Sequence, residues 1–182
     1  MALDKPGLQT ALTSFFTPFD LGGTLPESTG DPATHQSACA QLWANAMQTY
    51  VGDMAPLHVA ATGAASATLK TALEGVFATW YALDTYPSDN CGLLNAAFDA
   101  FASEIALSVG TETSGRTGGI PRLFIGTPPP SIDFCSLSTG DTYSAAAANF
   151  ATVIDDWFTQ GVSDTTDDNI PNGKLHLTLP WI

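Results

Sequence analysis

Hydrophobic side chains recur along much of the chain at the spacing of an α-helix. In five segments they fall at i, i+3, i+4 and i+7, the pattern of a helix that buries one face. The segments lie at about 8–16, 39–54, 69–80, 94–105 and 146–158. Helices with stripes of this width share a common core. The sequence therefore predicts an all-α fold, a helical bundle of about five helices in a single domain over residues 1–182.

Capping residues mark where some of these helices begin. Asp31 stands directly before Pro32. An acidic N-cap followed by proline is typical of a helix start. Asp141 is expected to cap the fifth helix in the same way. Pro87 and Gly92 are expected to bracket the turn between the third and fourth helices.

A different pattern appears at the end of the chain. From Lys174 to Leu179, apolar and polar residues alternate with a period of two, and the turn-forming pair Asn172-Gly173 comes before them. This predicts a short C-terminal β-strand or extended arm, residues 170–182. A strand needs a partner for its backbone groups. Residues 122–126 are a second candidate strand, and the two strands could pair with each other or with another subunit.

The two ends of the chain also resemble each other, which indicates an internal duplication. Thr17-Pro18 recurs as Thr127-Pro128, and the segment Ser28–Asp31 recurs as Ser138–Asp141. The repeat-like units span about 6–52 and 93–162, linked by a helix at about 63–85. The duplication predicts equivalent N-caps and equivalent core positions: Asp31 with Asp141, Trp43 with Phe150, and Tyr50 with Trp157.

Charge narrows the range of partners. The chain has 18 acidic and 5 basic residues, a net charge of −13, and only 13% charged residues in total. Such a chain lacks the basic patch that nucleic-acid backbones or anionic membranes require, so we expect neither as a partner. The outward faces of the second and third helices are almost free of charge. Because the cores of protein interfaces are depleted of charge, these faces could be subunit contacts. A general compositional habit of the source organism is the alternative.

The cysteines and histidines indicate no site. Three scattered cysteines are an odd number and form no disulfide framework, so we expect synthesis in a reducing cytosol. Cys39 lies in an apolar stripe, Cys91 in an exposed turn and Cys135 in an apolar position of the repeat. His35 and Cys39 share a helix face, but no second pair supports a metal site.

Catalytic signatures are also lacking. The sequence has no phosphate-binding loop, nucleophile elbow or zinc-protease motif. Asp155 and Asp156 are adjacent, cannot share one helix face and are expected to be solvated. The acidic run Asp164–Asn169 is expected to be a loop and could hold Ca²⁺, although it lacks the register of a calcium loop. We therefore predict no catalytic, cofactor-binding or metal-binding residue.

Two regions are candidates for contacts with a partner protein. Arg116 and Arg122 flank a glycine-rich loop in an otherwise acidic chain and could pair with carboxylates of a neighbour. The C-terminal end is too apolar to remain in water, so it is expected to dock either on its own bundle or on a neighbouring subunit. Its candidate contact residues are Leu175, Leu177, Leu179, Trp181 and Ile182.

Three short segments resemble a known class of proteins. The Gly126–Pro130 run, the Asp155–Phe158 segment and the terminal Pro-Trp-Ile resemble small Ala-rich virion structural proteins of tailed bacteriophages, from the neck or tail region. The resemblance implies a non-enzymatic structural subunit of a symmetric assembly. Its partners would be copies of itself and other virion proteins, and its location the virion, after synthesis in the host cytoplasm. The alternatives are a phage head decoration protein, a small acidic hydrolase or ligand-binding domain, and a DNA-mimicking inhibitor.

Overall fold

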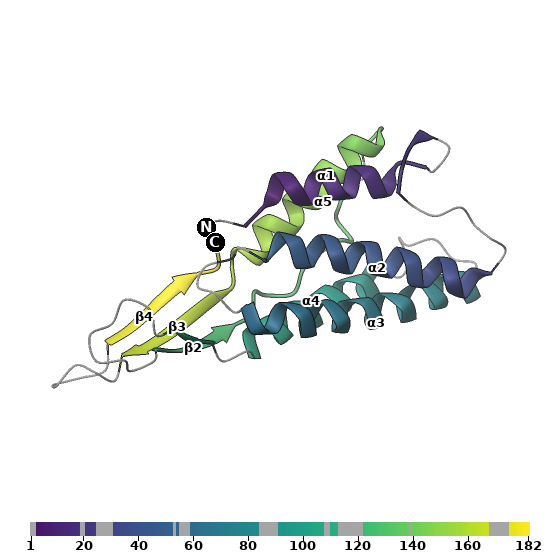
Figure 1. The fold of residues 1–182 in the computed structure, drawn as a ribbon. Coiled ribbons are helices and arrows are strands. Elements are labelled where there is room, and N and C mark those ends of the chain that lie inside the picture. The colour runs from purple at the N-terminus through teal and green to yellow at the C-terminus, as the bar shows by residue number, and fades with distance from the viewer. Residues whose placement is uncertain are drawn as a thin grey trace.

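The structure, a computed structural model, confirms the mainly α-helical bundle. It describes residues 3–18, 21–24, 31–52, 54, 59–83, 91–107, 110–112, 122–138, 140–167 and 175–182. Within these ranges the helices are α1 (Lys5–Phe16), α2 (Pro32–Tyr50), α3 (Val59–Leu83), α4 (Cys91–Leu107) and α5 (Tyr143–Phe158). Helices α1 and α5 lie side by side over the other three (Figure 1).

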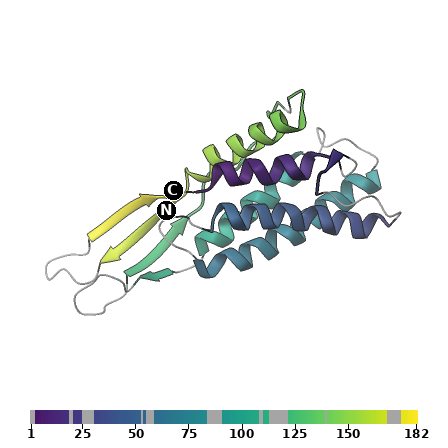
Figure 2. The ribbon, with the colours of Figure 1, turned by 45° about the horizontal axis from the view of Figure 1, so that its top comes forward.

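A small antiparallel sheet extends from one end of the bundle. Its strands are β1 (Gly110–Glu112), β2 (Arg122–Thr127), β3 (Val162–Asp167) and β4 (Leu175–Pro180), in the spatial order β1-β2-β3-β4. Both ends of the chain lie where the sheet meets the bundle (Figures 1 and 2). The opposite end of the bundle lies far from the sheet (Figures 1 and 2).

The two strands expected from the sequence are present as β2 and β4, but they do not pair with each other. Strand β3 lies between them and pairs with both. The interpretation of the acidic run from Asp164 as a loop is therefore wrong up to Asp167. Asp164 stands opposite Thr178, whose hydroxyl donates to its carboxylate at 2.6 Å. This cross-strand hydrogen bond satisfies an acidic side chain that a loop would leave in water. Residues 168 and 169 lie outside the described residues.

The predicted N-cap of α2 is confirmed, and the predicted N-cap of α5 is wrong. Asp31 caps α2, because its carboxylate accepts from the backbone N–H of Ala33. At α5 the cap is Thr142, whose hydroxyl accepts from the N–H of Ala145 at 3.1 Å. Two neighbouring residues are both good caps here, and the chain enters the helix one position later than Asp141. The expected equivalence of Asp31 and Asp141 is therefore wrong, and the duplication itself stays a prediction.

The expected turn between the third and fourth helices is wrong at one of its two ends. Helix α4 already begins at Cys91, so Gly92 lies inside its first turn rather than in a loop. Pro87 lies outside the described residues.

Aromatic side chains form the centre of the core. Trp43 of α2 packs edge-on against Phe98 of α4 at a centroid distance of 5.5 Å and against Phe15 of α1 at 5.3 Å. It also contacts Phe150 of α5 at 5.7 Å. Such pairs contribute about 0.5–1.5 kcal/mol each beyond the area they bury. One tryptophan thus joins four helices, and most of the positions expected in the core from the apolar stripes lie in it or pack against it.

Candidate interaction site

The C-terminal segment docks on its own chain. The indole of Trp181 is fully buried, 4.9 Å from the ring of Phe158, and its Nε1 donates to the hydroxyl of Ser163 at 2.9 Å. Its backbone N–H donates to the carbonyl of Gly161. A Cβ at Gly161 would lie only 2.3 Å from the indole, so glycine is required there. Of the two docking routes left open by the sequence, this structure shows docking within the chain.

This arrangement changes the list of partner contacts. Trp181 belongs to the core and is not a surface residue, so its assignment as a partner contact is wrong. Ile182 is 52% exposed and Leu179 is half-buried. Leu175 and Leu177 lie in β4, which is the last strand of the sheet within the described residues.

The two arginines are not brought together by anything the structure describes. Arg122 begins β2, in register with Glu112 of β1. Arg116 lies outside the described residues. The expected pairing of these arginines with a neighbour stays a prediction.

The segment that follows the three prolines at 128–130 is held against α4, a contact that no local pattern in the sequence indicates. We call residues 129–135 the strap. Ile132 and Phe134 point into the core, with exposed fractions of 2% and 6%. Their backbone N–H groups donate to the side chains of Asp99 and Asn95, each at 2.9 Å. The strap therefore makes side-chain hydrogen bonds to α4 in place of a strand partner.

The strap is also bonded covalently to α4. Cys91 and Cys135 form a disulfide with a Cα–Cα distance of 5.3 Å. The expectation that Cys91 is a bystander and that Cys135 occupies an apolar slot is therefore wrong. Cys135 is exposed. Sequence spacing could not show this pair, because 44 positions separate the two residues and only the tertiary fold brings them together. Cys39 remains a free thiol, and burial raises its pKa.

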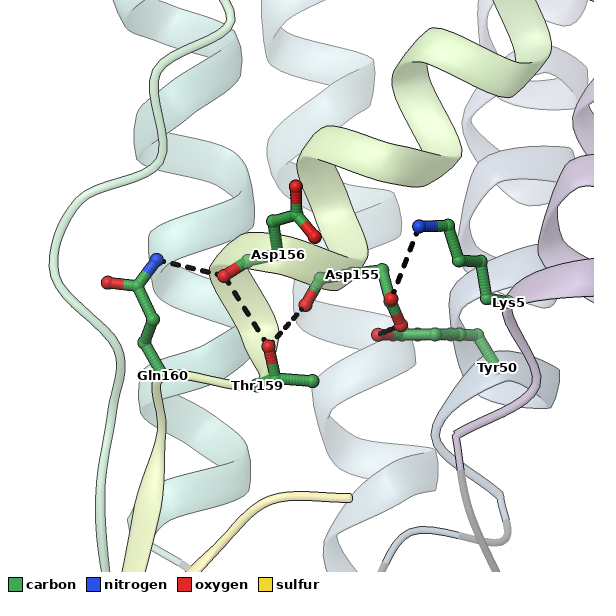
Figure 3. A network of polar contacts seen from close by, with 6 residues as sticks. All are labelled: Lys5, Tyr50, Asp155, Asp156, Thr159 and Gln160. Atoms are coloured by element: carbon green, nitrogen blue, oxygen red, sulfur yellow. Dashed lines mark hydrogen bonds and ion pairs between the residues drawn. The ribbon is translucent and has the colours of Figure 1, made fainter.

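A polar network joins three helices near the sheet end of the bundle (Figure 3). Asp155 of α5 accepts a hydrogen bond from the hydroxyl of Tyr50 at 2.9 Å and lies 3.4 Å from the ammonium of Lys5. The carboxylate of Asp156 points away from that of Asp155 (Figure 3). The two aspartates therefore do not share one face, as expected. The prediction that Asp155 is solvated is wrong, because α1 and α2 supply partners for it.

This network is structural in its chemistry. Tyr50 is fully buried; burial first, and then the charge of Asp155, raise its pKa. A phenol that holds its proton so firmly is a poor acid or base at neutral pH. None of its residues lines either of the two cavities described below. The network therefore ties α1, α2 and α5 together.

The outward face of α3 carries no charge. Its exposed positions between residues 63 and 82 hold only Gly, Ala, Thr and Tyr. We call these positions the neutral face: Gly63, Ala64, Ala67, Thr71, Gly75, Ala78, Tyr81 and Ala82. The two charged residues of α3 in this stretch, Lys70 and Glu74, form an ion pair, and both contact Ser37 of α2. Their charges are thus turned toward the bundle and paired.

Two shallow cavities lie on the described surface. One of about 370 Å³ follows the seam of α3 and α4, and among its lining residues are Gly75, Thr79 and Leu93. The other, of about 280 Å³, lies between α1 and α2 and includes Ser14, Thr24 and Asn45. No acidic, basic or histidine side chain lines either one. Acid–base chemistry would have no proton donor or acceptor of the usual kind there.

No cluster of metal ligands occurs among the side chains that the structure describes. No group of three His, Cys, Asp or Glu residues converges there. His35 has a buried Nδ1 without a hydrogen-bond partner, and Cys39 lies one helical turn away. Two ligands do not make a zinc site. The helices in the described ranges are all too short or too polar to span a bilayer.

Comparison of the chain with protein-family models, with curated proteins and with solved structures finds no match.

Proposed function

We propose that this protein is a non-enzymatic structural subunit of a symmetric assembly, most specifically a virion protein from the neck or tail of a tailed phage. The observation that carries the proposal is the neutral face of α3. A monomeric protein normally fills such a face with charged residues. Here a long exposed face remains neutral in a chain with a net charge of −13.

Two glycines of the neutral face support the proposal independently. Gly63 and Gly75 lie inside α3, and a Cβ at either position would meet nothing within 4 Å. Each glycine destabilises a helix by about 0.8–1.0 kcal/mol relative to alanine. The isolated chain gains no packing in return. A second backbone that approaches α3 closely would provide the missing reason, because glycine allows such an approach.

Electrostatics favours the same surface for contact between copies. Two chains of charge −13 repel each other, and the repulsion is least where the contacting surfaces carry no charge. Lys70 and Glu74 compensate each other at the margin of this surface. Hydrogen bonds from Lys70 first, and then from Ser37, hold the pKa of Glu74 below its usual value. Because the opposite charges of Lys70 and Glu74 are paired, they add no net positive or negative charge beside the neutral face.

The experiment is light scattering of the purified chain over a range of protein and salt concentrations. We expect oligomers of defined size. Their formation should strengthen with added salt, since the Debye length falls from about 30 Å at 0.01 M to about 8 Å at 0.15 M. A chain that remains monomeric at high concentration in both conditions contradicts the proposal.

The virion assignment has its own test in the neighbouring genes. They should encode head, neck or tail proteins, and the protein should be found in purified particles. Neighbours that all encode metabolic enzymes would contradict the assignment to a virion, and light scattering would still test self-assembly. A head decoration protein would share the neutral face and differ in its location on the particle.

One observation favours a function of another class. The cavity between α1 and α2 has polar lining from Ser14, Thr24 and Asn45, which suits a small neutral ligand. A saturable shift in melting temperature with a neutral small molecule, in a protein that stays monomeric, would support a ligand-binding domain instead.

A further inference from the structure

The strap is positioned on α4 by further contacts beside its disulfide, and one of them joins the amide nitrogen of Asn95 to the sulfur of Cys135 at 3.8 Å. Asn95 and Asp99 follow Cys91 at successive turns of α4, and all three side chains contact the strap. They meet it in reverse order along the chain: Asp99 contacts Ile132, Asn95 contacts Phe134, and Cys91 is bonded to Cys135. Side chains at i, i+4 and i+8 lie along one side of a helix.

The other side of the strap is held as well. The carbonyl of Pro130 accepts a hydrogen bond from the indole N–H of Trp157 on α5. Asp133 accepts from the backbone N–H of Cys135 at 2.9 Å and from the hydroxyl of Ser136. The hydrogen bond from Ser136 first, and then that from the N–H of Cys135, lower the pKa of Asp133. This local turn fixes the backbone at Cys135 without the sulfur bond.

The disulfide itself lies at the surface end of these contacts. Cys135 is exposed and Cys91 is half-buried, whereas Ile132 and Phe134 are buried. Because Cys135 is an exposed residue, we expect a small reagent in solution to reach its sulfur without opening the core. Buried apolar side chains and the hydrogen bonds to Asn95 and Asp99 would keep the strap in place after the sulfur bond is cut.

We infer that the Cys91–Cys135 bond is a redox lock that closes after folding, on two thiols that the fold has already aligned. The chemistry is thiol–disulfide exchange with a small disulfide such as oxidised glutathione. One protein thiolate attacks the small disulfide and releases one reduced thiol. The second protein thiolate then attacks the mixed disulfide, forms the Cys91–Cys135 bond and releases the second reduced thiol. Two protons leave the protein thiols, and two electrons pass to the small disulfide. A dithiol reverses the reaction.

The lock would explain how the chain can fold in a reducing compartment and gain stability in an oxidising one. Closing a loop of this length restricts the unfolded chain. We expect oxidation to raise the melting temperature by about 5–15 °C. The inference stands independently of the proposed assembly function, because it concerns the isolated chain.

The experiment compares the full chain after treatment with dithiothreitol and after treatment with oxidised glutathione, both without denaturant. The reduced chain should keep its helical circular dichroism and unfold in one transition at a lower temperature. Oxidation should remove two hydrogen atoms by intact mass, with Cys39 still free. Loss of the helical signal on reduction would overturn the inference, because the bond would then be needed for folding. Equal melting temperatures of the two forms would also overturn it.

A second measurement tests whether the fold aligns the thiols. In a glutathione redox buffer, Asn95→Ala and Asp99→Ala should each lower the equilibrium constant for closing the bond by about two- to tenfold. Gln41→Ala is the matched control, since the amide of this exposed residue donates to Asn45 one turn further along α2. Equal constants in all three variants and the parent chain would show that these contacts do not align the thiols, and would overturn the inference.

Discussion

The indole N–H of Trp181 donates to the hydroxyl of Ser163 across 2.9 Å, at a place where both side chains are completely buried. Ser163 belongs to β3, and Trp181 directly follows β4, the strand that pairs with it. The same indole packs on Phe158 at the end of α5. The end of the chain therefore joins the sheet to the helical core.

Replacing Trp181 tests this junction. Trp181→Ala should lower the free energy of unfolding by about 3–5 kcal/mol, because it leaves a large cavity and removes the hydrogen bond from the indole to Ser163. Chemical denaturation measures the change. Ile182→Ala is the control, since that side chain is mostly exposed, and should change stability by about 0.5 kcal/mol or less. A small effect of Trp181→Ala would show that the C-terminal segment is not part of the core.

Tyr50 gives the protein a predictable loss of stability in alkali. Its pKa in the folded state is raised above the ordinary value of 10.0, first by burial and then by the charge of Asp155. Above about pH 10 the unfolded chain releases this proton while the folded chain keeps it. Stability is therefore complete below pH 10 and falls above it, by up to about 1.4 kcal/mol per pH unit from this residue.

The measurement is unfolding by urea between pH 9 and about pH 11. Tyr50→Phe should make the fall with pH less steep, although it costs about 1–2 kcal/mol at neutral pH through the lost hydrogen bond. The control Tyr143→Phe changes an exposed tyrosine at the start of α5, and the slope should stay that of the parent chain. If the free energy of unfolding fell equally steeply with pH in the two variants, the assignment of this pH dependence to Tyr50 would be contradicted.

Helix periodicity carried most of the successful prediction of the fold. Apolar stripes of α2 to α5 predicted these elements because their core faces repeat every three or four residues, as Trp43 and Tyr50 do on α2. Strand β3 escaped prediction because its polar sequence, Val162–Asp167, resembles a solvated loop. Its structure comes from pairing on both sides with β2 and β4, which only the tertiary fold supplies.

The contacts between distant segments could not be predicted from the sequence either, because only the tertiary fold brings these segments together. The carboxylate of Asp155 meets Tyr50 across 105 positions of the chain, and the two bonded cysteines lie 44 positions apart. No local pattern encodes either pair. In contrast, the charge-poor face of α3 could be predicted, because it depends on composition and helical period alone.

The cap of α5 can be tested directly. Thr142→Ala should lower the free energy of unfolding by about 0.5–2 kcal/mol, since the N–H of Ala145 loses its acceptor. Asp141→Ala should change it by about 0.5 kcal/mol or less. Thermal unfolding of the two variants separates them. The reverse order of effects would place the cap at Asp141 and restore its equivalence with Asp31.

On the proposed function, the neutral face of α3 makes the contacts between subunits. The most direct measurement is the oligomer mass, by light scattering, of Thr71→Arg beside Thr152→Arg. Both threonines are exposed, the first on α3 and the second on α5, and arginine is a better helix former than threonine, so neither change should unfold the chain. We expect Thr71→Arg to yield monomers and Thr152→Arg to assemble like the parent chain. Assembly of both variants to the same extent, or loss of assembly only in Thr152→Arg, would contradict the claim.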